Sequence, residues 1–87
     1  MTTPSVSKTE LKAAEESVGW EVISHDALAA LEKWQEVTLA DMKATLVKCV
    51  ARFEANGARG VDLADEIDML RVAIAIREVR ETRRSPH

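Results

Sequence analysis

Aromatic side chains are scarce in this sequence. Trp20, Trp34 and Phe53 make up 3% of the residues, and tyrosine is absent. Hydrophobic residues nevertheless reach 46%, so the core has to be built from leucine, isoleucine, valine, methionine and alanine. A core of this kind suits helix packing better than a sheet, because strands are enriched in aromatic residues.

Cysteine is almost absent as well. Cys49 is the single cysteine, which excludes an internal disulfide and is typical of a protein from a reducing compartment. The first ten residues lack the basic and apolar regions of a signal peptide, and no apolar run approaches the roughly 18 residues of a membrane span. We therefore expect a cytoplasmic protein with no membrane association. The net charge of −3 and the pI near 5.3 argue against general nucleic-acid binding.

Glycine and proline are missing from a long stretch near the C-terminus, around which we expect the rest of the chain to pack. Asp62–Arg84 contains neither residue and few poor helix formers, which predicts one long helix of roughly 33 Å. Its middle, Met69 to Ile76, is apolar at every position except Arg71. A helix that is apolar on most sides has to be covered on several sides. We therefore predict that it is the central helix of a small bundle.

Helix signals also divide the earlier part of the chain. Ser7 followed by Glu10 matches a capping box and predicts a helix over Lys8–Val18, after a disordered segment at 1–6. The apolar content of this helix is thin, so we expect it to dock lightly. Gly19–Ile23 has the alternation of a strand, but nothing else in the chain supplies a partner strand. We interpret it as a linker whose Trp20 and Ile23 pack onto the bundle.

A second helix is predicted over His25–Val37, after Ser24 as the N-cap. Its expected inner face consists of Ala27, Leu28, Leu31 and Trp34. Thr38 then has the character of another N-cap, with Asp41 in the first turn of a third helix. Because no helix breaker separates the two segments, a single bent helix over residues 25–55 is an alternative interpretation.

The third helix has two stripes of apolar residues. The stripe of large side chains consists of Leu39, Met42, Leu46, Val50 and Phe53. The stripe of small side chains consists of Ala40, Ala44, Val47 and Ala51. The small stripe would let a neighbouring helix approach closely. Asn56-Gly57 then predicts the end of the helix. The sequence thus predicts an all-α fold, a small bundle of three to four helices with a long C-terminal helix, forming one domain over residues 7–87. The residues expected to be most buried are Leu46, Phe53, Ile67, Leu70 and Ile74.

The long helix also has two apolar stripes, and the second one predicts an interaction surface. It consists of Met69, Val72, Ile76 and Val79. The other predicted helices are too few and too short to cover it, so we expect a homodimer in which a second copy covers this stripe.

The charges of the long helix are polarised, with acids in its first turns and Arg77, Arg80 and Arg84 near its end. The helix dipole alone favours this order. Antiparallel pairing of two copies would favour the same order, because it sets the acidic start of one helix against the basic end of the other. An anion or nucleic-acid site is the third interpretation. The three arginines are included in the predicted interaction surface.

No catalytic, metal or cofactor motif stands out. Cys49 has only His25 and His87 as possible bases in the chain, so we interpret it as a buried small hydrophobe. The acids that begin at Asp62 do not match the spacing of a calcium loop. Gly57 to Gly60 has the outline of the GxxG loop of KH domains, but the chain lacks strands for the sheet of that fold.

We therefore expect a small non-enzymatic helical protein-interaction module without cofactors, an adaptor, inhibitor or regulator of bacterial or phage type. It would act on an unidentified protein partner through a helical surface, as a homodimer. The alternative is a dimeric nucleic-acid-binding regulator that uses the arginine-rich end of the last helix. A steep salt dependence of DNA binding would identify that alternative.

Overall fold

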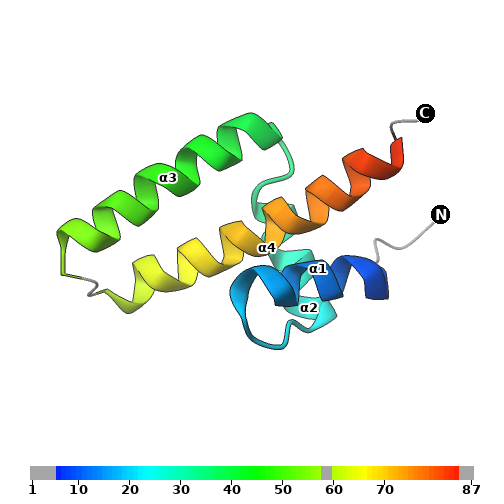
Figure 1. Cartoon of the computed structure of the whole chain (residues 1–87), viewed down its shortest axis with the longest axis horizontal. Coiled ribbons are helices and arrows are strands. Elements are labelled where there is room, and N and C mark those ends of the chain that lie inside the picture. The colour runs from blue at the N-terminus through cyan, green and yellow to red at the C-terminus, as the bar shows by residue number, and fades with distance from the viewer. Residues whose placement is uncertain (1–5, 58–59, 85–87) are drawn as a thin grey trace.

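The chain folds into four α-helices, α1 (Lys8–Val18), α2 (Ser24–Lys33), α3 (Leu39–Ala55) and α4 (Val61–Arg84) (Figure 1). The computed structural model describes residues 6–57 and 60–84. Within these ranges it contains no strand. The predicted all-α bundle with a long C-terminal helix is therefore confirmed.

Both ends of α1 form as the sequence predicts. The Ser7 hydroxyl accepts a hydrogen bond from the backbone N–H of Glu10 at 3.2 Å, and the Glu10 carboxylate accepts one from the backbone N–H of Ser7 at 2.9 Å. These two bonds satisfy N–H groups that have no partner inside the helix. At the other end Gly19 has a φ of 80°, a left-handed conformation that favours glycine and ends the helix.

Helices α2 and α3 are separate, so the alternative of one bent helix is wrong. Thr38 caps α3 by accepting a hydrogen bond from the backbone N–H of Asp41 at 3.1 Å. Helix α2 is shorter than predicted: it begins at Ser24 and ends at Lys33 instead of Val37, and its N-cap is Ile23, which forms no side-chain cap.

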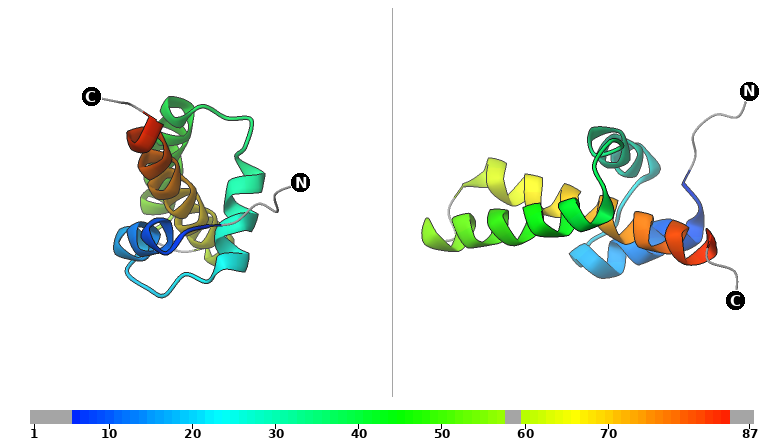
Figure 2. Two further views of the ribbon diagram at one scale, coloured as in Figure 1. Left: turned by 90° about the vertical axis from the view of Figure 1, so that its right-hand side faces the viewer. Right: turned by 90° about the horizontal axis from the view of Figure 1, so that it is seen from above.

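Helix α4 is the centre of the molecule and contacts each of the other three helices, whereas α2 and α3 do not contact one another. Seen from the end of the molecule, the three shorter helices surround α4 (Figure 2, left). The middle of α4 is accordingly buried, and Leu70, Val72, Ala73 and Ile76 are all 0% exposed. The prediction of a central helix covered on several sides is confirmed.

Helices α3 and α4 form an antiparallel hairpin in which the start of α3 reaches Arg77 and Glu78 of α4. Helices α1 and α2 lie against α4 away from α3 (Figure 1). Ile67, Leu70 and Ile74 are buried as predicted. Leu46 and Phe53 are only half-buried, so their predicted burial is wrong. The reason is that, among the described helices, α3 contacts only α4, which leaves Met42 as the one buried residue of α3.

Two expectations about the N-terminal half are also wrong. Helix α1 docks closely on α4, and its Ala14 is fully buried, because a small residue allows the two helices to approach. In the segment between α1 and α2, Val22 is the buried residue, at 2% exposed, while Trp20 and Ile23 are 39% and 54% exposed. The backbone N–H of Val22 donates to the Glu15 carboxylate at 3.3 Å, which ties this part of the segment to α1.

The predicted disordered segment lies outside the described residues except for its last residue, Val6, which is half-buried against the core. No helix in the described part of the chain is both long enough and apolar enough to cross a membrane.

Candidate interaction surfaces

The stripe predicted as a dimer interface is mostly inside the molecule. Val72 and Ile76 are 0% exposed, and Met69 and Val79 are half-buried. The expectation that the rest of the chain cannot cover this stripe is therefore wrong for its two central residues. Ile76 and Arg80 lie one helical turn apart on the same face of α4, and Arg80 contacts Glu10 of α1. Helix α1, which was expected to dock only lightly, thus lies against this side of α4.

Arg77 holds α4 to the connection between α2 and α3. Its guanidinium donates to the backbone carbonyl of Trp34 at 3.4 Å, to that of Val37, and to the sulfur of Met42 at 3.3 Å. The carbonyls beyond the last turn of a helix have no partner within it. Arg77 binds two carbonyls just after the end of α2, and the Trp34 carbonyl also accepts from the backbone N–H of Val37 at 3.1 Å. The role of Arg77 is therefore structural.

Arg80 forms a close ion pair with Glu10, with 2.6 Å between its Nε and a Glu10 carboxylate oxygen. The Glu10 side chain is only 5% exposed, and its other oxygen accepts the capping bond from Ser7. Burial raises the pKa of Glu10, but the hydrogen bonds from Arg80 and Ser7 and the charge of Arg80 outweigh it. The pKa of Glu10 therefore lies below its ordinary value, and the carboxylate is ionised at neutral pH.

These contacts change the interpretation of the predicted arginine surface. Arg77 and Arg80 are both engaged with groups of their own chain. The side chain of Arg84 lies outside the described residues. Of the predicted surface, the guanidinium groups of Arg77 and Arg80 thus hold α4 to the α2–α3 connection and to α1.

The acidic start of α4 forms no metal site in the described residues, where no group of three potential acidic, histidine or cysteine ligands comes together. Glu66 instead faces Lys33 of α2 at 3.8 Å, and both side chains are well exposed. Exposed pairs of this kind contribute only about 0–1 kcal/mol. His25 lies on α2 and Cys49 on α3, two helices without mutual contact, so these two residues do not form a nucleophile and base.

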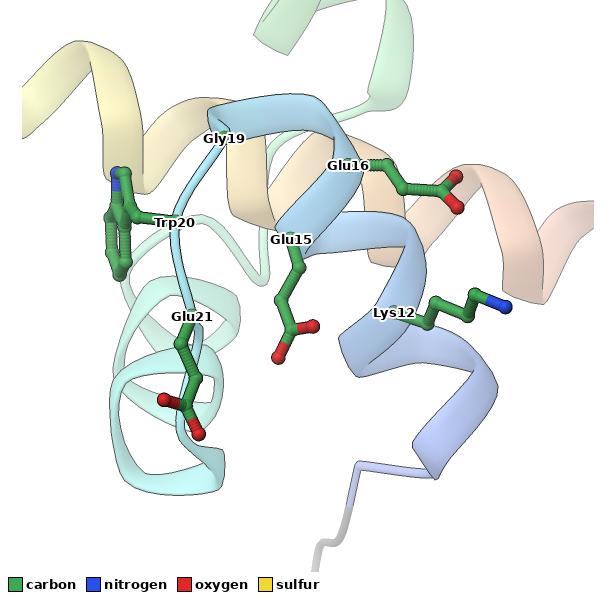
Figure 3. A pocket seen from close by; sticks show the side chains of 6 residues that line it. All are labelled: Lys12, Glu15, Glu16, Gly19, Trp20 and Glu21. Atoms are coloured by element: carbon green, nitrogen blue, oxygen red, sulfur yellow. The ribbon is translucent and has the colours of Figure 1, made fainter.

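An open depression lies beside the end of α1 and has a volume of about 610 Å³ (Figure 3). Its lining residues are Lys12, Glu15, Glu16, Gly19, Trp20 and Glu21. The side chains diverge: Trp20 extends to one side of the segment that follows α1, and Lys12 and Glu16 extend to the opposite side. No set of groups converges on one point, so the depression offers no defined ligand site.

The surface that sequence reasoning missed is the outer side of α3. We call Ala40, Ala44, Val47 and Ala51 the outer stripe. All four residues are exposed, and Val47 is 69% exposed. The sequence shows this stripe as a place where a helix can approach closely, but the buried residue of α3, Met42, belongs to its other stripe. Among the described helices, α4 is the one neighbour of α3 (Figures 1 and 2).

The outer stripe has the spacing of a helix–helix seam. Its residues are separated by four, three and four positions, the repeat that keeps apolar residues on one side of a helix along a coiled coil. Asp41 and Lys48 flank one edge of the stripe, and Lys43 flanks the other. Lys43 pairs with Glu78 of α4 at 3.4 Å in an exposed contact. Asp41 and Lys48 form no ion pair within residues 6–57 and 60–84.

Comparison with protein-family models, curated proteins and solved structures gives no match for this chain. In the absence of a relative, the exposed outer stripe of α3 is the feature from which we infer a function.

Proposed function

We propose that this chain is a non-enzymatic helical protein-interaction module that binds a protein partner through the outer stripe of α3. The observation that carries the proposal is the exposed Val47, at 69%, in the middle of three exposed alanines at seam spacing. Single exposed apolar residues are normal on protein surfaces and indicate nothing. Four of them along three turns of one helix form a continuous apolar strip, which is what helix-mediated recognition uses.

The packing of α3 supports the same proposal. A surface helix needs one apolar face to attach it to the core, and α3 already has that face in the residues around Met42, which contact α4. The outer stripe is additional apolar surface that is exposed in the described part of the chain. A partner helix laid along it would meet mainly methyl groups and could approach to the short interaxial distances of about 8 Å that small residues allow.

The alternative of nucleic-acid binding through the end of α4 has no comparable support. Phosphate recognition needs guanidinium groups that are directed outward. Arg77 and Arg80 are instead directed toward the backbone carbonyls after α2 and toward the Glu10 carboxylate.

The test is affinity capture from the native host with three forms of the immobilised chain. Val47→Glu places a charge in the outer stripe, and Arg52→Glu is the matched control, because it changes an exposed residue of the same helix away from the stripe. We expect a host protein to be retained by the wild type and by Arg52→Glu and to be lost with Val47→Glu. Equal retention by all three forms would refute the assignment to α3.

A further inference from the structure

We infer that the outer stripe of α3 pairs with the outer stripe of a second copy of this chain, with the two α3 helices antiparallel. This inference rests on the proposed function and names the partner of the same surface. It differs from a dimer built on the second stripe of α4, whose central residues Val72 and Ile76 are buried within one chain.

The spacing of the outer stripe fits itself when one copy is reversed. Its intervals of four, three and four residues are the same from either end. An antiparallel pair centred on the stripe therefore sets Ala40 against Ala51 of the partner subunit, and Ala44 against Val47 of the partner subunit. Each layer contains at least one alanine, so the two helices can pack at close range along the whole stripe.

The charges beside the stripe select the antiparallel arrangement. In an antiparallel pair each edge of the seam faces the same edge of the other copy. Asp41 then lies opposite Lys48 of the partner subunit, and Lys48 lies opposite Asp41 of the partner subunit, which makes two ion pairs between residues that have none within the described chain. In a parallel pair, Lys43 would instead face Lys48 of the partner subunit across the seam, and the like charges would repel.

The second edge of the seam does not oppose the antiparallel arrangement. Lys43 lies opposite Val50 of the partner subunit there, and its ammonium group can keep its exposed contact with Glu78. The helix itself is accessible, because α3 lies at the margin of the molecule in both figures and α4 is on its other side. The small side chains limit the buried area, so we expect a weak, concentration-dependent dimer.

Disulfide trapping tests the arrangement directly. All variants carry Cys49→Ser, which removes the native thiol. An equimolar mixture of Ala40→Cys and Ala51→Cys should give a mixed disulfide on mild oxidation, because these positions face one another. Ala40→Cys alone should give none, because the two copies of residue 40 are then separated by eleven residues, about 16 Å along the axis. A disulfide requires Cα atoms within about 7 Å.

Charge exchange supplies the second measurement, by sedimentation equilibrium up to millimolar concentration at low salt. Lys48→Glu turns both ion pairs into repulsions and should weaken the dimer about tenfold. Adding Asp41→Lys should restore it, and the control Arg52→Glu should leave it unchanged. Circular dichroism confirms in each case that the monomer is folded.

A monomer at every concentration together with no mixed disulfide would overturn the inference, as would efficient trapping of Ala40→Cys alone, which requires a parallel pair. In that event the proposed function still stands if Val47→Glu abolishes capture of a host protein. It fails as well if Val47→Glu has no effect on capture.

Discussion

Glu10→Gln tests whether the ion pair between α1 and α4 stabilises the fold. The glutamine keeps the shape of the side chain and can still accept the capping bond from Ser7, but it removes the charge that faces Arg80 at 2.6 Å. A hydrogen bond to a charged group contributes about 1.5–3 kcal/mol. Because the Arg80 side chain is 41% exposed, water can partly replace the lost partner. We therefore expect a loss near the lower end, about 1.5 kcal/mol.

The pH dependence of this loss gives the sharper test. The pKa of Glu10 is lowered in the folded state, so its ionised carboxylate stabilises the protein at pH values above its pKa in the unfolded chain, about 4.3. That contribution is lost as the pH falls through the lowered pKa of the folded state. Below it, the wild-type side chain is protonated and resembles glutamine. The difference in unfolding free energy between the wild type and Glu10→Gln should therefore shrink toward zero in acid.

Urea unfolding followed by circular dichroism at neutral pH and at several acidic values measures this difference. At neutral pH the expected loss corresponds to roughly 6–12 °C in melting temperature for a chain of this size. Glu16→Gln is the control, because Glu16 is an exposed carboxylate of the same helix, and it should change the stability by less than about 0.5 kcal/mol. A Glu10→Gln difference that is the same at neutral and acidic pH would refute the role of the charge.

Three further substitutions test the packing. Leu70→Ala truncates a fully buried residue of α4 and should lower the unfolding free energy by roughly 2–5 kcal/mol; a loss below about 1 kcal/mol in urea unfolding would contradict the assigned core. Ile76→Glu places a charge at a side chain that is 0% exposed, so the protein should unfold and lose its helical circular dichroism signal. A folded monomer would instead show that this residue belongs to an interface. Arg77→Met keeps the apolar stem but removes the Arg77 hydrogen bonds to the carbonyls of Val37 and Trp34, of which the latter keeps its bond from the backbone N–H of Val37. The loss should cost about 1–3 kcal/mol and speed hydrogen exchange just after α2; unchanged exchange there would argue against this contact.

The ends of most helices could be predicted because they depend on a few neighbouring residues. Ser7 with Glu10, Thr38 with Asp41, and Gly19 act through hydrogen bonds or backbone angles within one turn. A pattern of residue types is sufficient to recognise such local chemistry. The end of α2 is the exception, because the carbonyl of its C-cap residue Trp34 accepts a hydrogen bond from Arg77, more than 40 residues away in the sequence. No local signal reports a partner at that distance.

The faces that pack together were harder to predict, because they depend on how small residues fit. Ala14 makes α1 a close neighbour of α4 although few of its residues are apolar. The same helix buries Glu10, an acid that the sequence assigns only to a cap. Its second role becomes visible once Arg80 is known to lie beside it. A sequence pattern predicts docking from the number of apolar residues on a helix face, whereas α1 docks on α4 through a small residue and an ion pair.

The prediction of a second copy began from the idea that α4 has more apolar surface than the rest of the chain can cover. The structure shows that α1 and α2 cover much of that surface, but both lie away from α3. Among the described helices, α3 then has α4 as its single neighbour, and its outer stripe is exposed to water. One helix thus still has apolar surface that its neighbours do not cover, but that helix is α3 and not α4. A partner expected on grounds of coverage should therefore be sought at Val47, which is 69% exposed, and not at Ile76, which is 0% exposed.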